Sequence, residues 1–255
     1  MTVASRPLVG WRILVTRPAE QIPPFAAALE SAGAIAVPHP TIAVLPAPSW
    51  NALDQALAAI TDYQWAIFTS PSAVRFTLGR AGEKGVSLAA LQIAAVGTET
   101  ARALEAAGIK VDVLPAFDQQ RQEGLAAALA LLPAGTRVLF PQAIGGRDFL
   151  VESLGRQGCA VEVVAVSRTV ALALGGAPPA FDVATFASPS AFRAFVDGHG
   201  AAALQGRVVA AIGPTTAAAI AAAGVGVDVV SEAPSATAMV SALIAFRQRT
   251  DAGKV

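Results

Sequence analysis

The stretch Trp65-Ala-Ile-Phe-Thr-Ser-Pro-Ser-Ala-Val74 returns later in the chain as Val183-Ala-Thr-Phe-Ala-Ser-Pro-Ser-Ala-Phe192. Two further pairs of segments repeat in the same order: AVGTETA (95–101) with AIGPTTA (211–217), and RILV (12–15) with RVLF (137–140). Because the matching segments keep their order in both halves, the pattern indicates an internally duplicated unit. The best-matched segments are loops rich in Gly, Ser and Thr, so the duplication predicts two similar sets of functional loops.

Working outward from these segments, short apolar runs alternate with Ala- and Leu-rich helical stretches, which predicts parallel sheets covered by helices on both faces. We expect strands at residues 12–16, 65–69, 93–96, 111–114, 137–140, 160–166, 183–186, 208–212 and 227–230. We expect helices at residues 23–32, 49–59, 72–81, 98–107, 123–132, 148–157, 190–197, 215–223 and 236–249. The predicted fold class is α/β, with two similar lobes.

Two stretches interrupt this alternation. Residues 37–46 contain three prolines among apolar residues, and residues 167–179 contain paired glycines and paired prolines. Both suit a chain that passes between lobes. We therefore expect a discontinuous first lobe of residues 1–38 and 170–255, with residues 39–169 inserted as the second lobe. A two-stranded crossing would join the lobes, with the active site in the cleft between them.

The composition excludes several classes of protein. The chain of 255 residues has a formal net charge of zero and 14% charged residues, which argues against nucleic-acid or anionic-membrane binding. No long apolar run predicts a membrane span, and residues 1–9 lack the apolar core of a signal peptide. The single cysteine, Cys159, excludes an internal disulfide and a cysteine-based zinc site. We expect a cytoplasmic monomer without a metal ion or cofactor.

Four repeated loops are candidates for ligand binding, because ligands of open parallel sheets bind beyond the carboxyl ends of strands. They are TSPS (69–72), GTET (97–100), ASPS (187–190) and GPTT (213–216). Each opens a predicted helix, whose free N–H groups and dipole favour an anion. A purely structural role as helix caps is the alternative for any single loop. Four such loops together suit a large ligand with several carboxylates.

Other residues with possible chemistry give weaker signals. Arg17 and Arg147 each follow the first strand of a unit, where a guanidinium would bind carboxylates or simply be solvated. For His39, between two prolines, and His199, in a predicted Gly-rich loop, a linker or surface role is favoured over catalysis. Neither a phosphate-binding P-loop nor a dinucleotide fingerprint is present. No set of residues typical of hydrolases or metalloenzymes stands out.

At these residues the chain resembles the uroporphyrinogen-III synthase family. The resemblance covers nearly the whole chain, and it rests on an ordered set of weak motifs: LVTRP (14–18), FTSPSAV (68–74), AVGTETA (95–101), EGL (123–125), LFP (139–141) with Arg147, FASPSAF (186–192), AIGPTTA (211–217) and Pro234. The resemblance implies closure of hydroxymethylbilane, a linear tetrapyrrole with many carboxylates, to uroporphyrinogen III. Water is lost and the last pyrrole ring is inverted. It also implies a transient contact with the deaminase that acts upstream.

The residues that the resemblance implies for substrate binding come from both halves of the chain. They are Arg17, Ser70, Ser72, Arg147, Ser188, Ser190, Gly213, Thr215 and Thr216. Many family members have a tyrosine near the second crossing, where this chain has Ser167 in Val166-Ser-Arg-Thr169. Either the tyrosine is dispensable, which we favour, or Ser167 with a bound water replaces it, or the enzyme is slow. Ser167 is thus only a weak candidate for catalysis.

Two other functions stay open at this stage. A two-lobed cytoplasmic module that binds a small molecule without catalysis would use the same fold. An isomerase or transferase of phosphosugars would place phosphates at the same helix starts.

Overall fold

The computed structural model describes residues 6–252. Residues 1–5, which belong to the segment expected to lack a signal peptide, and residues 253–255 lie outside the described part. Contacts within the chain divide it into two compact units: the chain up to Ala43 together with the chain from Val170, and Val44–Thr169. The first is called unit 1 and the second unit 2. No described helix has the length and apolar character needed to cross a membrane.

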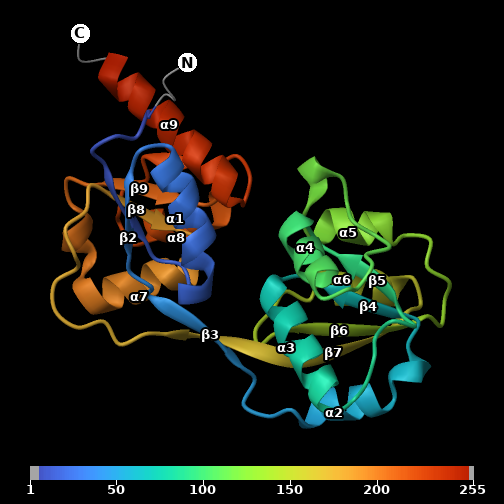
Figure 1. Ribbon diagram of the computed structural model, residues 1–255. Coiled ribbons are helices and arrows are strands. Elements are labelled where there is room, and N and C mark those ends of the chain that lie inside the picture. Colours follow the sequence, from blue (N-terminus) through green and yellow to red (C-terminus); the bar gives the residue numbers. More distant parts are fainter. Residues whose placement is uncertain (1–5, 253–255) are drawn as a thin grey trace. The chain divides into compact units, whose positions relative to one another are not determined.

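Unit 1 contains a five-stranded sheet in the order β10-β9-β8-β1-β2, and all four neighbouring pairs are parallel (Figure 1). Its strands are β1 (Arg12–Val15), β2 (Ile35–Pro38), β8 (Val183–Phe186), β9 (Val208–Ala211) and β10 (Val229–Val230). Its helices are α1 (Ile22–Ser31), α7 (Pro189–His199), α8 (Pro214–Ala222) and α9 (Ala236–Ala252).

Helices cover both faces of this sheet because successive strand residues point to opposite sides. Ile13 and Val15 pack with α1 and α9 in one hydrophobic cluster. Leu14, between them, packs with α7 and α8 in another, which includes the fully buried Phe186 and Phe195. The continuous apolar runs of the sequence are therefore central strands of a doubly covered sheet. The expected α/β fold is confirmed in this unit.

Unit 2 is built around the second five-stranded sheet, in the order β3-β7-β6-β4-β5. Its strands are β3 (Ile42–Pro46), β4 (Trp65–Phe68), β5 (Gln92–Ala95), β6 (Arg137–Ala143) and β7 (Ala160–Ala171). Its helices are α2 (Asn51–Ala58), α3 (Pro71–Glu83), α4 (Thr98–Ala106), α5 (Gln122–Ala128) and α6 (Phe149–Arg156). Strands β4 to β7 pair in parallel. Helices α2, α3 and α4 share one cluster with the sheet, and α5 and α6 share the other.

Corresponding strands lie in the same order in the two sheets. The order β2-β1-β8-β9 of unit 1 matches β7-β6-β4-β5 of unit 2 when the repeated segments are paired. Side-chain contacts with the backbone match too. Asp228 accepts the N–H of Val209 at 2.8 Å, and Asp112 accepts that of Ile93 at 2.9 Å. A common strand order with equivalent polar contacts is what an internal duplication predicts.

The interrupted stretches are more regular than we expected. Residues 37–46 contain the end of β2 and all of β3, and the second crossing is the far end of β7. The Ala47 N–H donates to Val166 O at 3.1 Å and the Leu172 N–H to Thr41 O at 2.9 Å, so β3 runs antiparallel to β7. Two of the prolines end strands, where no ladder hydrogen bond is lost.

Two expectations about local structure are wrong. Residues 111–114 form no strand, and only Val113 makes an isolated bridge, to Ala94. The following Pro115 limits further extension of the pairing. His199 does not lie in a loop, because α7 continues to this residue before Gly200 turns the chain with a φ of 77°. All nine predicted helices are present within the described residues, with bounds that differ by a few residues.

Candidate functional site

The carboxyl ends of the parallel strands in unit 1 meet at one edge of the sheet, and the sequence-predicted residues of this unit follow them. Arg17 follows β1, Ser188 follows β8, and Gly213 follows β9. The chain winds away from β1 in both directions, so β1 and β8 flank the topological switch point. Open α/β sheets bind ligands at that point. Arg17 and Ser188 therefore stand on either side of the place where the fold favours a ligand.

Two buried threonines fix β1 and β8 at this edge. The Thr16 hydroxyl donates to Thr185 O at 2.7 Å, and the Thr185 hydroxyl donates to Leu14 O at 2.8 Å. Beyond them, the half-buried Arg17 side chain stacks over the ring of Phe25, with 4.9 Å between the guanidinium carbon and the ring centre. The strand ends are thus held together by hydrogen bonds, and a ring orients the cation that follows them.

The two predicted serines of α7 have different roles. Ser188 is the N-cap, and its hydroxyl oxygen accepts the N–H of Ala191 at 3.1 Å. Its own hydroxyl hydrogen remains available as a donor. Ser190 lies one residue inside the helix with its side chain exposed. The structural explanation for this loop is therefore correct for Ser188 and does not apply to Ser190.

The start of α8 is open. Gly213 is its N-cap residue and has no side chain with which to cap the helix. An added Cβ on Gly213 would meet no atom within 4 Å. Thr215 is exposed, whereas Thr216 is 2% exposed and packs against the unit. Helix α8 begins with Pro214, which has no N–H, so its first backbone donors are the N–H groups of Thr215 and Thr216, next to the empty space beside Gly213.

The counterpart loop in unit 2 is filled. Gln120 Oε1 accepts the backbone N–H of Thr98, the first residue of α4, at 3.0 Å. The same amide contacts the Thr98 hydroxyl, and its atoms lie within 3.1–3.6 Å of a Cβ built on Gly97. A side-chain amide therefore occupies the space beside Gly97, whereas the space beside Gly213 is empty. The N–H that Gln120 caps has no counterpart in α8, because Pro214 stands at that position.

The remaining predicted residues of unit 2 lie at the carboxyl edge of its sheet. Ser70 caps α3 and accepts the N–H of Ala73 at 3.1 Å, while Ser72 is a half-buried residue of the first turn. Arg147 is exposed and pairs with Glu123, and this contact lowers the pKa of the Glu123 carboxyl. Arg147 therefore has an internal carboxylate partner in the absence of a ligand.

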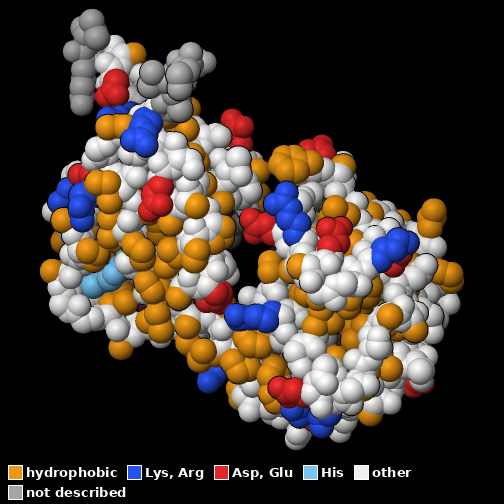
Figure 2. All heavy atoms as spheres, viewed as in Figure 1, with side chains coloured by type: hydrophobic (Ala, Val, Ile, Leu, Met, Phe, Trp, Pro, Cys, Tyr) orange, Lys and Arg blue, Asp and Glu red, His pale blue; other side chains and the backbone are white. Residues whose placement is uncertain are grey.

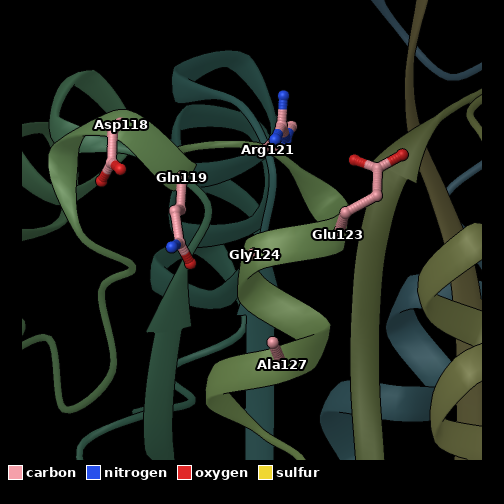
Figure 3. A pocket seen from close by; sticks show the side chains of 6 residues that line it. All are labelled: Asp118, Gln119, Arg121, Glu123, Gly124 and Ala127. Carbon is pink, nitrogen blue, oxygen red and sulfur yellow. The ribbon is translucent and has the colours of Figure 1, made fainter.

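A cavity of about 350 Å³ lies beside this pair. It is lined by Asp118, Gln119, Arg121, Glu123, Gly124 and Ala127 (Figure 3). Two of its charged groups are carboxylates and one is a guanidinium, so the lining offers no excess positive charge to a polyanion. On the face in Figure 2, acidic and basic side chains are interspersed in each unit. Chemistry thus favours the open helix start over this cavity as an anion site.

Residues 23–241 match the family described as uroporphyrinogen-III synthase HemD. This chain belongs to the uroporphyrinogen-III synthase family. The resemblance drawn from the ordered loop motifs is thereby confirmed.

Relatives and solved structures agree with this membership. A uroporphyrinogen-III synthase of Synechococcus elongatus is 41% identical over 62% of this chain, and the match covers 61% of that protein. One from Chlorobaculum parvum is 30% identical, with 86% of this chain and 92% of that protein covered. The solved uroporphyrinogen-III synthetase of Helicobacter pylori shares the fold, with a TM-score of 0.62 and 18% identity over 92% of this chain and 98% of that one.

Ser167 occupies the position at which the family resemblance places a tyrosine. It lies on β7, is 1% exposed, and its hydroxyl has no hydrogen-bond partner among the described residues. Its backbone carbonyl accepts the N–H of Ile144 at 2.8 Å, next to an irregularity in the β6–β7 register. The enclosed hydroxyl is therefore not presented at the surface of this unit.

Sequence reasoning missed Gln120. Nothing in its neighbourhood repeats in the other half of the chain, and it lies far along the chain from the loop that it fills. The four loops looked equivalent in sequence, and the difference between α4 and α8 becomes visible only in the structure. The repeated loops drew attention to these positions, and the structure shows that the repeats differ in whether a side chain fills the space beside the glycine.

Proposed function

We propose that this chain is a uroporphyrinogen-III synthase that closes hydroxymethylbilane to uroporphyrinogen III, with loss of water and inversion of the last pyrrole ring. The observation that carries the proposal, beside the family membership, is the empty space at the start of α8, which follows β9 on the same edge of a fully parallel sheet as the switch point between β1 and β8. The substrate bears many carboxylates, which suit unpaired helix N–H groups.

The proposed substrate-binding residues belong to the two sheet edges. In unit 1 they are Arg17, Ser188, Ser190, Gly213, Thr215 and Thr216, and in unit 2 they are Ser70, Ser72 and Arg147. Guanidinium groups and backbone N–H groups make charge-assisted hydrogen bonds with carboxylates. We expect a substrate carboxylate to compete with Glu123 for Arg147.

The reaction needs the protein mainly to position the bilane. The free bilane loses its hydroxyl and closes spontaneously, but that path leaves the last ring uninverted. To obtain the inverted product, the chain must hold the terminal ring so that its substituted carbon is attacked, through a spiro intermediate. Holding reacting atoms together and placing charge are the larger contributions. Assistance to the departing hydroxyl by an acid is smaller, and we assign no such role to the enclosed Ser167.

The rest of the proposal concerns context. We expect the protein to act as a cytoplasmic monomer that needs no cofactor, binds neither nucleic acid nor membrane, and receives its substrate through a transient contact with the upstream deaminase. Mixed surface charge gives no reason for a nucleic-acid partner.

Analysis of product isomers tests the function. Hydroxymethylbilane would be generated in situ from porphobilinogen by a deaminase, the protein added, and the oxidised porphyrins separated by chromatography. A dominant type III isomer above the control without protein is the expected result. Production of type I alone by folded protein would contradict the proposal and favour a binding module without catalysis.

Replacing Thr215 and Thr216 by Val tests the carboxylate site. The loss of one hydrogen bond to a charged group costs about 1.5–3 kcal/mol, so loss of the exposed Thr215 hydroxyl alone should lower kcat/KM at least about ten-fold. Val matches Thr in shape, so the thermal midpoint should change little. Thr77→Val is a matched control, since Thr77 is buried in α3 with an unpartnered hydroxyl. Full activity in the double variant would remove Thr215 and Thr216 from the site.

A further inference from the structure

The chain contains two histidines, and the fold brings them together within unit 1. His39 follows β2 and stands between Pro38 and Pro40, and His199 is the last residue of α7. Their Nε2 atoms are 2.8 Å apart, although 160 residues separate them in the sequence. Both side chains are partly exposed. A contact this short requires that one Nε2 atom carries a hydrogen and donates it, while the other Nε2 atom accepts.

The hydrogen-bond partners determine where that proton lies. His199 Nδ1 is 3.0 Å from the carbonyl oxygen of Gly176, which only accepts, so Nδ1 carries a hydrogen. In the neutral ring, His199 Nε2 then has a lone pair and accepts from His39 Nε2–H. When both rings are protonated, both Nε2 atoms carry hydrogens and positive charges face each other. The contact therefore exists only while at least one ring is neutral.

The pair attaches the segment between β2 and β3 to α7. A second attachment lies two residues further on, where the buried Thr41 hydroxyl donates to Ala191 O at 2.9 Å. The Thr41 N–H also reaches Thr16 O, at the end of β1, at 3.3 Å. Thr41 thus holds the first turn of α7 and His39 holds its last residue. The same helix begins at Ser188, which we have proposed as a substrate contact.

Low pH is the condition under which the hydrogen bond between His39 and His199 is lost. The pKa of His39 lies below its ordinary value, because burial disfavours its charged form and, to a smaller extent, because His199 is near. Among the described residues, the hydrogen bonds and ring contacts of the two imidazoles involve, besides each other, the Phe195 ring and the Gly176 carbonyl, which carry no charge. A depressed folded-state pKa adds stability above the unfolded value and loses it as the pH falls.

We propose that His39 and His199 form a proton-released clasp that fixes the β2–β3 segment on α7 and so positions the Ser188 end of that helix for substrate. The clasp is closed at about pH 7.5, and it opens as the pH falls towards about 5. His39 is a positioning residue, because it acts through α7. Only the effect on substrate rests on the proposed function.

Amide hydrogen exchange tests the clasp without any substrate. Protection factors, which correct for the intrinsic pH dependence of exchange, would be measured for Thr41, whose N–H donates to Thr16 O. They should fall about ten-fold between about pH 7.5 and 5 in the unmodified protein. His199→Phe keeps a ring against Phe195 but makes neither hydrogen bond, so protection should be low at both pH values. Protection independent of pH in the unmodified protein would overturn the clasp.

Thr41→Val is the matched control. It removes the neighbouring attachment and leaves both histidines, so protection should be lower while the pH step persists. His39→Asn provides a second test of the pair if the Phe variant fails to fold, and it too should abolish the step. A step retained in a folded histidine variant would assign it to another group and overturn the proposal.

Enzyme kinetics test the positioning role. In the unmodified protein KM should rise between about pH 7.5 and 5 more steeply than in His199→Phe, with kcat less affected. Equal KM profiles, together with a pH step in exchange, would overturn the positioning role and leave the clasp. Absence of synthase activity would instead overturn the proposed function, and the exchange result would still decide on the clasp.

Discussion

At the scale of single residues, the two serines of each Ser-Pro-Ser loop differ in whether they cap the helix that follows. Ser70 and Ser188 accept a helix N–H and serve as N-caps, while Ser72 and Ser190 lie inside the first turn without that role. Helix capping uses the hydroxyl oxygen of the first serine of each loop, and its hydroxyl hydrogen is the part left to donate to a substrate. The second serine has no structural duty of this kind, which makes it the better indicator of ligand binding.

Replacing each serine of α7 by Ala separates the two roles. Ser188→Ala should lower the free energy of unfolding by about 1 kcal/mol, because a capped N–H loses its acceptor. Ser190→Ala, at an exposed position, should leave stability within about 0.5 kcal/mol and raise KM. Denaturant unfolding and steady-state kinetics check both. A Ser190→Ala protein with unchanged KM would remove this residue from the proposed site.

Part of the site could be predicted from single residues. The cap positions of Ser70 and Ser188 follow from Ser before Pro at a helix start. The pairing of Arg147 with Glu123 could not be predicted, because one is exposed, the other is half-buried, and they lie 24 residues apart in the sequence. The burial of Ser167 could not be predicted either, because a single Ser within an apolar strand does not indicate which neighbours cover it.

At the scale of elements, α4 and α8 are counterparts in the two repeats, and they differ in the contacts at their first residues. Gln120 supplies an acceptor to α4, and it belongs to the segment just after the short 3-10 turn Phe117–Gln119. Nearby, an added Cβ on Gly124 would lie 2.1 Å from Gln119 O, so this segment packs tightly on α5. The segment and α4 thus stabilise each other, whereas α8 begins with Pro214, which has no N–H for such a contact.

Replacing Gln120 by Ala should therefore loosen α4 without affecting α8. The loss of one cap predicts a cost of about 1 kcal/mol. Amide exchange should become faster at the start of α4 and in residues 117–121, and it should stay unchanged in α8. Gln119→Ala is the control, because the hydrogen bonds between Thr98 and this segment are made by Gln120 among the described residues. Unchanged exchange at α4 would contradict the capping role of Gln120.

Elements were predicted best where periodicity and burial agree. All nine helices and the central strands followed from apolar runs between turn residues. The sequence did not reveal β2 as a strand or the regular pairing of β3, because prolines in residues 37–46 resemble a linker. The isolated bridge at Val113 is the opposite error, since a short apolar run alone does not secure a neighbour in the sheet.

At the scale of the whole molecule, each of the five hydrophobic clusters of the described residues stays within one unit. Two belong to unit 2, and three belong to unit 1. Each unit therefore has its own core on both faces of its own sheet, which is the physical condition for independent folding. Unit 1 is nevertheless formed by two segments of chain, because unit 2 is inserted between Ala43 and Val170.

Removing the insertion tests this independence. The β3–β7 hydrogen bonds set a register in which Ala43 lies opposite Val170, so an Asn-Gly turn can join them as a tight hairpin in place of residues 44–169. We expect the shortened chain to unfold cooperatively, reported by the fluorescence of Trp11, its one remaining tryptophan. Leu14→Ala in the same chain should cost about 2–5 kcal/mol, as for a packed core. A gradual transition insensitive to Leu14→Ala would mean that unit 1 needs unit 2 to fold.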